Sequence, residues 1–198
     1  NLVMDTLAAL AFGGEPAIHR YMNEKPKSRD EQIVSKAMWS QIFTGAAWAF
    51  ILSLVFLIAT PIQTMFLNDK AESFNDYTSK ASTVLMVPNP ENARGVAAGN
   101  ELFKYLFTGY FTLFIFLAVF NAFNARTEQV NLFDNIRGNK GFLKILGIIV
   151  IIQIAMTYLG GNIMNCYGLN VQQWLIIMVM AISIIPIDLI RKLIVKSR

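Results

Sequence analysis

Charged residues are scarce in this sequence. Lys, Arg, Asp and Glu make up 15% of the 198 residues, against a hydrophobic fraction of 55%. An ordinary soluble domain carries about 25% charged residues. The scarcity of charge therefore argues against a soluble globular domain and favours a membrane protein.

Cysteine and histidine are almost absent, with Cys166 and His19 as the single examples. One cysteine excludes an intrachain disulfide and argues against redox chemistry. An intramembrane metalloprotease would need histidines inside the membrane, and the sequence offers none. An intramembrane aspartyl protease would need two membrane carboxylates, whereas Asp188 lies near the end of an apolar run. We expect His19 to be a solvated surface residue and Cys166 to have no role.

Long apolar runs are the main feature of the sequence. A hydrocarbon core about 30 Å thick needs about 20 apolar residues of helix. The sequence predicts an all-α, polytopic transmembrane helix bundle with one partial and four full spans. Residues 66–101, by contrast, are polar and predict an extracytoplasmic loop. The predicted spans cover residues of about 1–12, 41–65, 102–125, 142–160 and 172–190.

Basic residues alternate between the predicted connections. Residues 13–40 and 126–141 and the C-terminal tail are rich in Lys and Arg, whereas residues 161–170 carry no charge and the loop before residue 101 is net acidic. Basic residues favour the cytoplasmic side of a membrane. We therefore expect a multi-pass protein whose C-terminus is cytoplasmic. The same bias accounts for the net charge of +4, so a nucleic-acid partner is not expected.

Polar side chains within the apolar runs are the candidates for function. Asn1 and Asp5 lie four residues apart and would project from one face of a helix. An ionisable residue at membrane depth costs about 3 kcal/mol and is a functional candidate when it faces protein. Carboxylate and amide oxygens are also ligands that calcium accepts. The spacing alone leaves open a second interpretation, in which Asp5 pairs with a lysine near the membrane surface.

The remaining intramembrane polar groups predict structural roles. We expect Asn121, Asn124 and Gln153 to form hydrogen bonds between helices, since amides commonly join helices in lipid. Gly45 and its alanine neighbours predict a face for close helix packing. Pro186 predicts a bend in the last span.

The order of motifs resembles one family. The opening Asn-Leu-Val-Met-Asp-Thr-Leu-Ala, followed by Glu15-Pro16, resembles the sixth membrane helix of P-type calcium ATPases of the plasma-membrane branch (type IIB). The stretch Phe-Asn-Ala-Phe-Asn-Ala-Arg at 120–126 resembles the end of the eighth helix in that branch. The resemblance implies the region from within the sixth helix to the tenth, in the cell membrane. It also implies that Asn1 and Asp5 are ligands of transported Ca²⁺.

Two departures from the family pattern affect the number of ion sites. Two-site calcium pumps have Thr where this chain has Met4, and Glu where alignment on Asn121 and Asn124 gives Ala118. A thioether is a poor calcium ligand and a methyl group is none. The resemblance therefore implies a pump with a single calcium site.

Other family motifs are missing from this sequence. It contains no Asp-Lys-Thr-Gly-Thr phosphorylation sequence and no Gly-rich nucleotide loop. We therefore expect no catalytic or cofactor-binding residue here. ATP and Mg²⁺ would bind upstream, in cytoplasmic domains of the same pump. The implied partners of this chain are these domains, the preceding membrane helices and the lipid bilayer. The alternatives are the membrane domain of a pump for another cation, such as sodium, potassium or protons, and a non-catalytic membrane scaffold.

Overall fold

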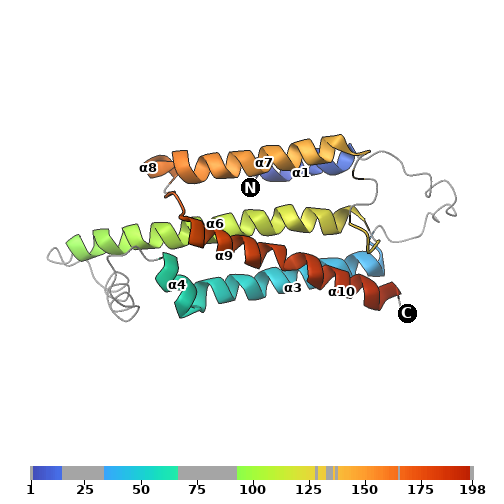
Figure 1. The fold of residues 1–198 in the computed structure, drawn as a ribbon, viewed down its shortest axis with the longest axis horizontal. Coiled ribbons are helices and arrows are strands. Elements are labelled where there is room, and N and C mark those ends of the chain that lie inside the picture. The colour runs from blue at the N-terminus through green and yellow to red at the C-terminus, as the bar shows by residue number, and fades with distance from the viewer. Residues whose placement is uncertain are drawn as a thin grey trace. The chain divides into compact units, whose positions relative to one another are not determined.

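The computed structural model describes residues 2–14, 34–66, 93–127, 129–132, 136, 138–164 and 166–196, with the backbone alone at 2–5, 93–104, 162, 164 and 196. Every regular element in these ranges is a helix (Figure 1), which confirms the predicted all-α class. The helices are α1 (Leu2–Gly13), α3 (Lys36–Ile58), α4 (Thr60–Phe66), α6 (Ala93–Arg126), α7 (Lys140–Leu159), α8 (Gly161–Met164), α9 (Val171–Ile182) and α10 (Ile184–Lys196).

Among the described residues, four helical segments are long and apolar enough to cross a membrane. They are Lys36–Ile58, Tyr105–Arg126, Lys140–Leu159 and Val171–Val195. Helix α1 is also apolar, but its 12 residues extend about 18 Å, less than the thickness of a hydrocarbon core. Four full spans and one partial helix therefore form the predicted polytopic transmembrane bundle.

The apolar run at residues 41–65 is divided between α3 and α4. Pro61 has no amide hydrogen, so the Leu57 carbonyl loses its usual helical donor four residues on. The side-chain amide of Gln63 donates a hydrogen bond to that carbonyl instead. The break between the two helices is thus a proline effect whose cost a neighbouring side chain offsets.

Three helices extend well past the apolar runs that predicted them. Helix α3 begins at Lys36, before residue 41, and α6 begins at Ala93, inside the predicted loop of residues 66–101. Helix α10 continues to Lys196, beyond residue 190. Hydropathy identifies the part of a helix that lies in lipid, whereas backbone hydrogen bonding continues into polar sequence. The last span is interrupted at Ser183. Pro186 leaves the Ile182 carbonyl without its helical donor at this point, where the sequence predicts a bend.

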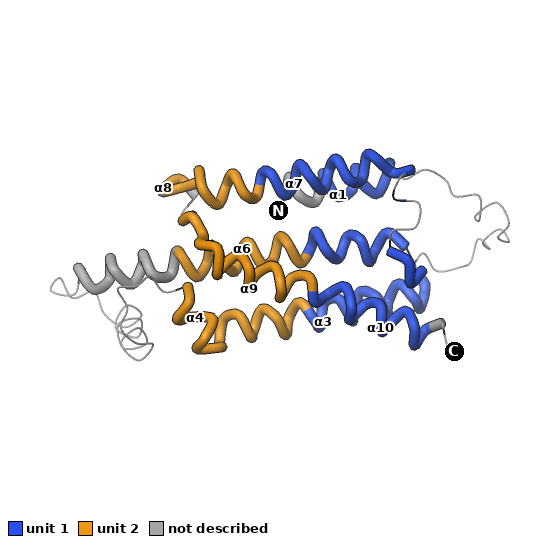
Figure 2. The backbone as a smooth tube through the Cα atoms, viewed as in Figure 1, with its two compact units in different colours: residues 1–48, 118–152, 183–198 blue, residues 49–117, 153–182 orange. Residues whose placement is uncertain are grey.

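The chain divides into two compact units, coloured separately in Figure 2. Unit 1 comprises residues 1–48, 118–152 and 183–198. Its core includes Phe142, which is fully buried. The Phe142 ring contacts Phe12 of α1 and Phe123 of α6, with centroids 5.8 and 5.5 Å away. Helix α7 begins beside this contact, where the Asn139 side chain accepts a hydrogen bond from the Phe142 amide.

Unit 2 comprises residues 49–117 and 153–182. Phe56 and Phe66 are fully buried and meet edge to face, with ring centroids 5.0 Å apart. They pack against Gly109, where a Cβ atom would overlap the Phe66 ring and approach Phe56 Cζ to 3.0 Å. Helix α6 and the segment from α3 to α4 therefore meet at a position that only glycine can occupy without displacing a ring.

Candidate functional site

The predicted calcium ligands lie at the edge of what the structure describes. Asp5 is within α1, so its backbone is helical as the prediction requires. Asn1 and the side chain of Asp5 lie outside the described residues. Among the described residues, no group of three or more His, Cys, Asp or Glu side chains could hold a metal ion. That search does not include the predicted pair, which stays a prediction.

The far end of α1 is held by apolar contacts within unit 1. Ala11 is 1% exposed, and Phe12 packs on the buried Phe142 ring. The Arg126 guanidinium lies 5.7 Å from the centre of the same ring and donates a hydrogen bond of 3.1 Å to the Leu132 carbonyl. The helix that carries Asp5 is therefore anchored, seven residues beyond it, to the end of α6 and the start of α7.

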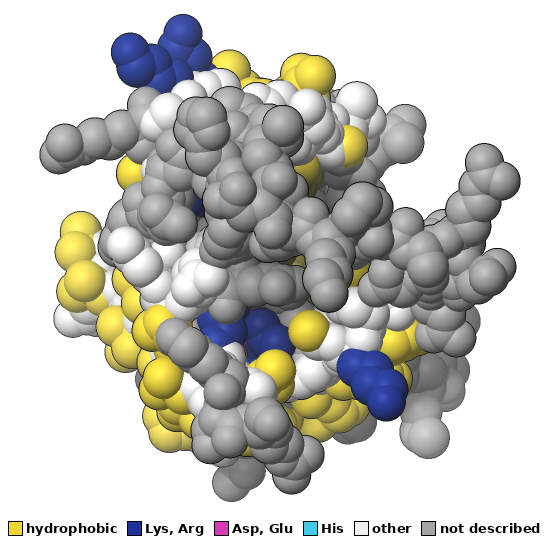
Figure 3. All heavy atoms as spheres, turned by 90° about the vertical axis from the view of Figure 1, so that its right-hand side faces the viewer, with side chains coloured by type: hydrophobic (Ala, Val, Ile, Leu, Met, Phe, Trp, Pro, Cys, Tyr) yellow, Lys and Arg dark blue, Asp and Glu magenta, His cyan; other side chains and the backbone are white. Residues whose placement is uncertain are grey.

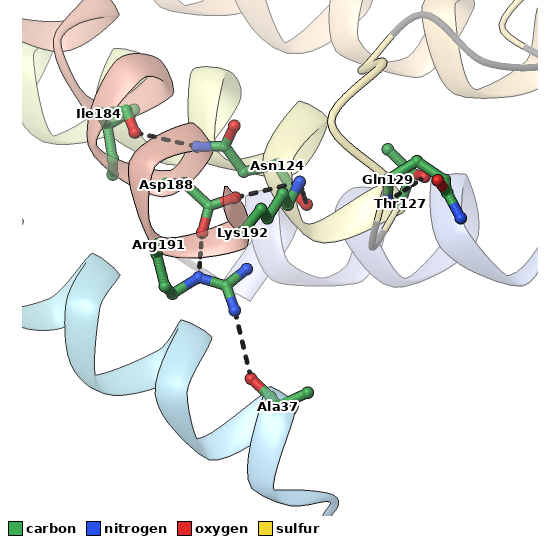
Figure 4. Close-up of polar contacts among 8 residues, drawn as sticks. All are labelled: Ala37, Asn124, Thr127, Gln129, Ile184, Asp188, Arg191 and Lys192. Carbon is green, nitrogen blue, oxygen red and sulfur yellow. Dashed lines mark hydrogen bonds and ion pairs between the residues drawn. The ribbon is translucent and has the colours of Figure 1, made fainter. Parts of the chain in front are cut away.

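A buried carboxylate forms the most highly charged cluster described (Figure 4). Asp188 of α10 is 5% exposed. Its Oδ1 atom lies 2.6 Å from Arg191 Nε and its Oδ2 atom 3.1 Å from Lys192 Nζ. These spacings of three and four residues place all three charges on one face of the helix. One anion is thus shared by two cations.

The cluster also joins α10 to two other helices of unit 1. Lys192 Nζ donates to the Asn124 carbonyl at 3.0 Å, and Asn124 Nδ2 donates to the Ile184 carbonyl at 3.1 Å. Arg191 donates to the Ala37 carbonyl of α3 at 3.4 Å. Figure 4 shows Asp188 between Arg191 and Lys192 of its own helix, and Arg191 reaching Ala37 of α3. Such contacts fix helix ends, and they assign Asp188 a structural role.

A cavity of about 240 Å³ adjoins this cluster. Figure 3 shows Lys and Arg side chains, in dark blue, set back in the middle of the face at this end of unit 1. The side-chain nitrogen of Gln41 is shielded from solvent and has no hydrogen-bond partner among the described residues. The cavity is lined by Ala37, Gln41, Gln129, Val130, Arg191, Lys192 and Val195.

Two of the predicted interhelical amides are confirmed. Asn124 joins α6 to α10, as described above, and is fully buried. In unit 2, Gln153 of α7 donates to the hydroxyl of Thr112 in α6 at 3.1 Å. Asn121 lies beside Gly45, where an added Cβ atom would come 3.7 Å from the amide oxygen. This is an ordinary van der Waals distance, so α3 packs against Asn121 at Gly45 but the contact does not require glycine.

The partners of Arg191 and Lys192 were not predicted from the sequence. There, both residues indicated only positive charge on the cytoplasmic side. Their spacing from Asp188 was the available signal, because ion pairs on a helix form at spacings of three and four residues.

Cys166, in unit 2, is half-buried. Burial raises the pKa of its thiol, and a hydrogen bond with the Thr108 side chain opposes that shift.

The fold defines the chain as a multi-pass membrane domain. Its sequence matches the family model described as "Cation transporting ATPase, C-terminus" over residues 1–194. The chain therefore belongs to this family of C-terminal membrane regions of cation-transporting ATPases.

The relatives are calcium-transporting ATPases of plasma-membrane type. The chain is 28% identical over 195 residues to "Calcium-transporting ATPase 5, plasma membrane-type" of Oryza sativa subsp. japonica, covering 98% of this chain and 15% of the relative. It is 28% identical over 177 residues to "Plasma membrane calcium-transporting ATPase 1" of Homo sapiens, covering 88% of this chain and 12% of the relative. The chain thus spans about one seventh of the rice relative's length.

Proposed function

We propose that this chain is the membrane part of an ATP-driven calcium export pump, and that Asn1 and Asp5 supply ligands to its transmembrane Ca²⁺ site. The observation that carries the proposal is the place of Asp5 in α1, an apolar helix within a chain of this family. Asn1 precedes it by four residues, so the two oxygen-bearing side chains would share one helix face. The names of the relatives support calcium as the ion.

The two residues would complete a site that other helices begin. Calcium takes six to eight oxygen ligands, and one carboxylate with one amide supplies at most three. The remaining oxygens would come from membrane helices upstream of this chain. ATP and Mg²⁺ would bind in the cytoplasmic domains of the same pump. Phosphorylation there would switch access to the site from the cytoplasm to the exterior. The C-terminus of this chain would lie in the cytoplasm.

We further propose that the pump has one calcium site. Met4 precedes Asp5 on α1, and Ala118 lies half-buried on α6, at the positions where two-site pumps carry oxygen ligands. Neither a thioether nor a methyl group can replace a hard oxygen donor for calcium. A second site would therefore lack ligands from both helices.

Ion selectivity and stoichiometry of the full-length pump test the proposal. Micromolar Ca²⁺ should stimulate ATP hydrolysis, and equilibrium binding should give one Ca²⁺ per phosphorylatable pump. Stimulation by sodium, potassium or protons in place of calcium would contradict the assignment of the ion. Two bound calcium ions per pump would contradict the single site while leaving the assignment of the ion intact.

A further inference from the structure

We propose that the cavity beside Asp188 binds a phosphate-bearing anion. Its polar lining is Gln41, Gln129, Arg191 and Lys192, and its apolar lining is Ala37, Val130 and Val195. All seven residues belong to unit 1. The lining does not include the proposed calcium ligands, and the proposal does not depend on which ion the pump transports.

The charge of the cluster favours an anion. Arg191 and Lys192 contribute two positive charges and Asp188 one negative charge, so the three side chains together carry a charge of +1. Arg191 contacts Asp188 through Nε and the Ala37 carbonyl through one terminal nitrogen. A guanidinium has five N–H donors arranged for recognition of carboxylate or phosphate. The cluster therefore combines a surplus positive charge with donor capacity beyond these two contacts.

The side-chain amide of Gln41, which lacks a hydrogen-bond acceptor in the described part of the chain, supports the anion site independently of the charges. Its nitrogen is shielded from solvent and lacks an acceptor among the described residues, although the residue lines the cavity. A buried donor without an acceptor is destabilising, and most buried polar groups in native structures are paired. A phosphate oxygen in the cavity would supply the acceptor. The same group would lie in the field of Arg191 and Lys192.

Size and position agree with a small anionic group. The cavity of about 240 Å³ is many times the volume of about 10–15 Å³ that a cavity needs to hold one water molecule, so it has room for a phosphate group. It lies between the start of α3 and α10, on the side of the membrane that is predicted to be cytoplasmic. Basic pockets between membrane helices on that side bind the headgroups of anionic lipids. A lipid headgroup and a phosphate from solution are the two sources of such an anion.

The test uses Gln41→Glu in the full-length pump, because this change keeps the shape of the side chain and replaces its donor by a negative charge. Gln172→Glu on α9 is the matched control, since Gln172 is exposed and is not part of the cavity lining. The purified variants are placed in nanodiscs of phosphatidylcholine containing a minor fraction of phosphatidylserine. Native mass spectrometry then measures retained phosphatidylserine, and a parallel titration in phosphatidylcholine alone measures binding of inorganic phosphate.

Gln41→Glu should weaken binding of the anion about tenfold, whereas Gln172→Glu should leave it unchanged, because a hydrogen bond to a charged group is replaced by a repulsion. Loss of retained phosphatidylserine would support the site with a lipid source, and loss of phosphate binding would support it with a soluble source. If Gln41→Glu does not fold, Gln41→Leu removes the donor alone and should weaken binding by a smaller factor. Equal binding of both probes by the wild type and a folded Gln41 variant would overturn the proposal.

Discussion

Asp188 shows how a single residue can organise the end of a membrane helix. Its two oxygens are held by Arg191 and Lys192, and the side chain is 6% exposed. A buried charge costs several kcal/mol unless it is paired and hydrogen-bonded. Here Lys192 also reaches the Asn124 carbonyl. The carboxylate, the ammonium and the backbone of α6 should therefore depend on one another energetically.

A double-mutant cycle should reveal this coupling. Lys192→Met should destabilise the protein by about 1–3 kcal/mol, because a hydrogen bond to a charged group is lost and Asp188 keeps Arg191 alone. Adding Asp188→Asn should then cost less than it does in the wild type, with a coupling energy of about 1–2 kcal/mol. Unfolding in mixed detergent micelles measures both values. Lys144→Met on the exposed face of α7 is the control, with an expected change in stability within about 0.5 kcal/mol. Additive effects of Lys192→Met and Asp188→Asn would disprove the coupling.

Residue-level prediction from the sequence succeeded where chemistry leaves few choices. An amide in an apolar helix needs a hydrogen-bond partner, so interhelical roles for Asn124 and Gln153 followed from their residue types. The identity of the partners did not follow. The Asn124 carbonyl that binds Lys192 lies 68 residues away along the chain. Its position depends on the rotation of α6 and α10 about their axes, which hydropathy does not determine.

At the scale of helices, proline and glycine determine where elements break and how closely they approach. Pro61 separates α3 from α4, and Gln63 satisfies the carbonyl that the proline leaves free. Gly109 instead permits the contact of α6 with Phe56 and Phe66. The sequence alone indicated the apolar run at 41–65 but not its division, because a proline in a membrane helix can also be accommodated by a bend.

Gly109→Ala should destabilise unit 2 by about 1–3 kcal/mol, because the new methyl group would displace the Phe66 ring from a packed core. Gly147 on α7 provides a matched control, since a Cβ atom added there meets nothing within 4 Å. Gly147→Ala should be neutral or stabilising by up to about 1 kcal/mol, as alanine is the better helix former. Thermal unfolding in detergent compares the two variants. Equal destabilisation by both substitutions would contradict the close packing at Gly109.

For the whole molecule, composition and the length of apolar runs were sufficient to predict the fold class. Runs of about 20 apolar residues have one stable form in lipid, which is a helix with its backbone hydrogen bonds closed. Four such helices are present in the described part of the chain. The calcium site could not be predicted to the same degree. Under our proposal calcium needs more oxygen ligands than Asn1 and Asp5 can supply, and the side chains of these two residues lie outside the described residues.

The predicted topology places Cys166 on the extracytoplasmic side, in the connection between residues 161 and 170. With the other cysteines of the full-length pump replaced, a membrane-impermeant thiol reagent added outside intact cells should label Cys166. Because burial raises the pKa of this thiol, less thiolate is present at neutral pH than for a free cysteine, and labelling should be slow there and accelerate as the pH rises towards 9 and above. Labelling that requires permeabilised cells would reverse the assigned orientation.

The most direct test of the calcium assignment is phosphoenzyme formation by the Asp5→Asn variant of the full-length pump. The substitution removes the anionic ligand and keeps the size of the side chain. Calcium-dependent phosphorylation from ATP should be abolished, because it requires an occupied site, whereas phosphorylation from inorganic phosphate should persist and show that the variant is folded. Normal calcium-activated phosphorylation from ATP in that variant would contradict the role of Asp5 as a calcium ligand.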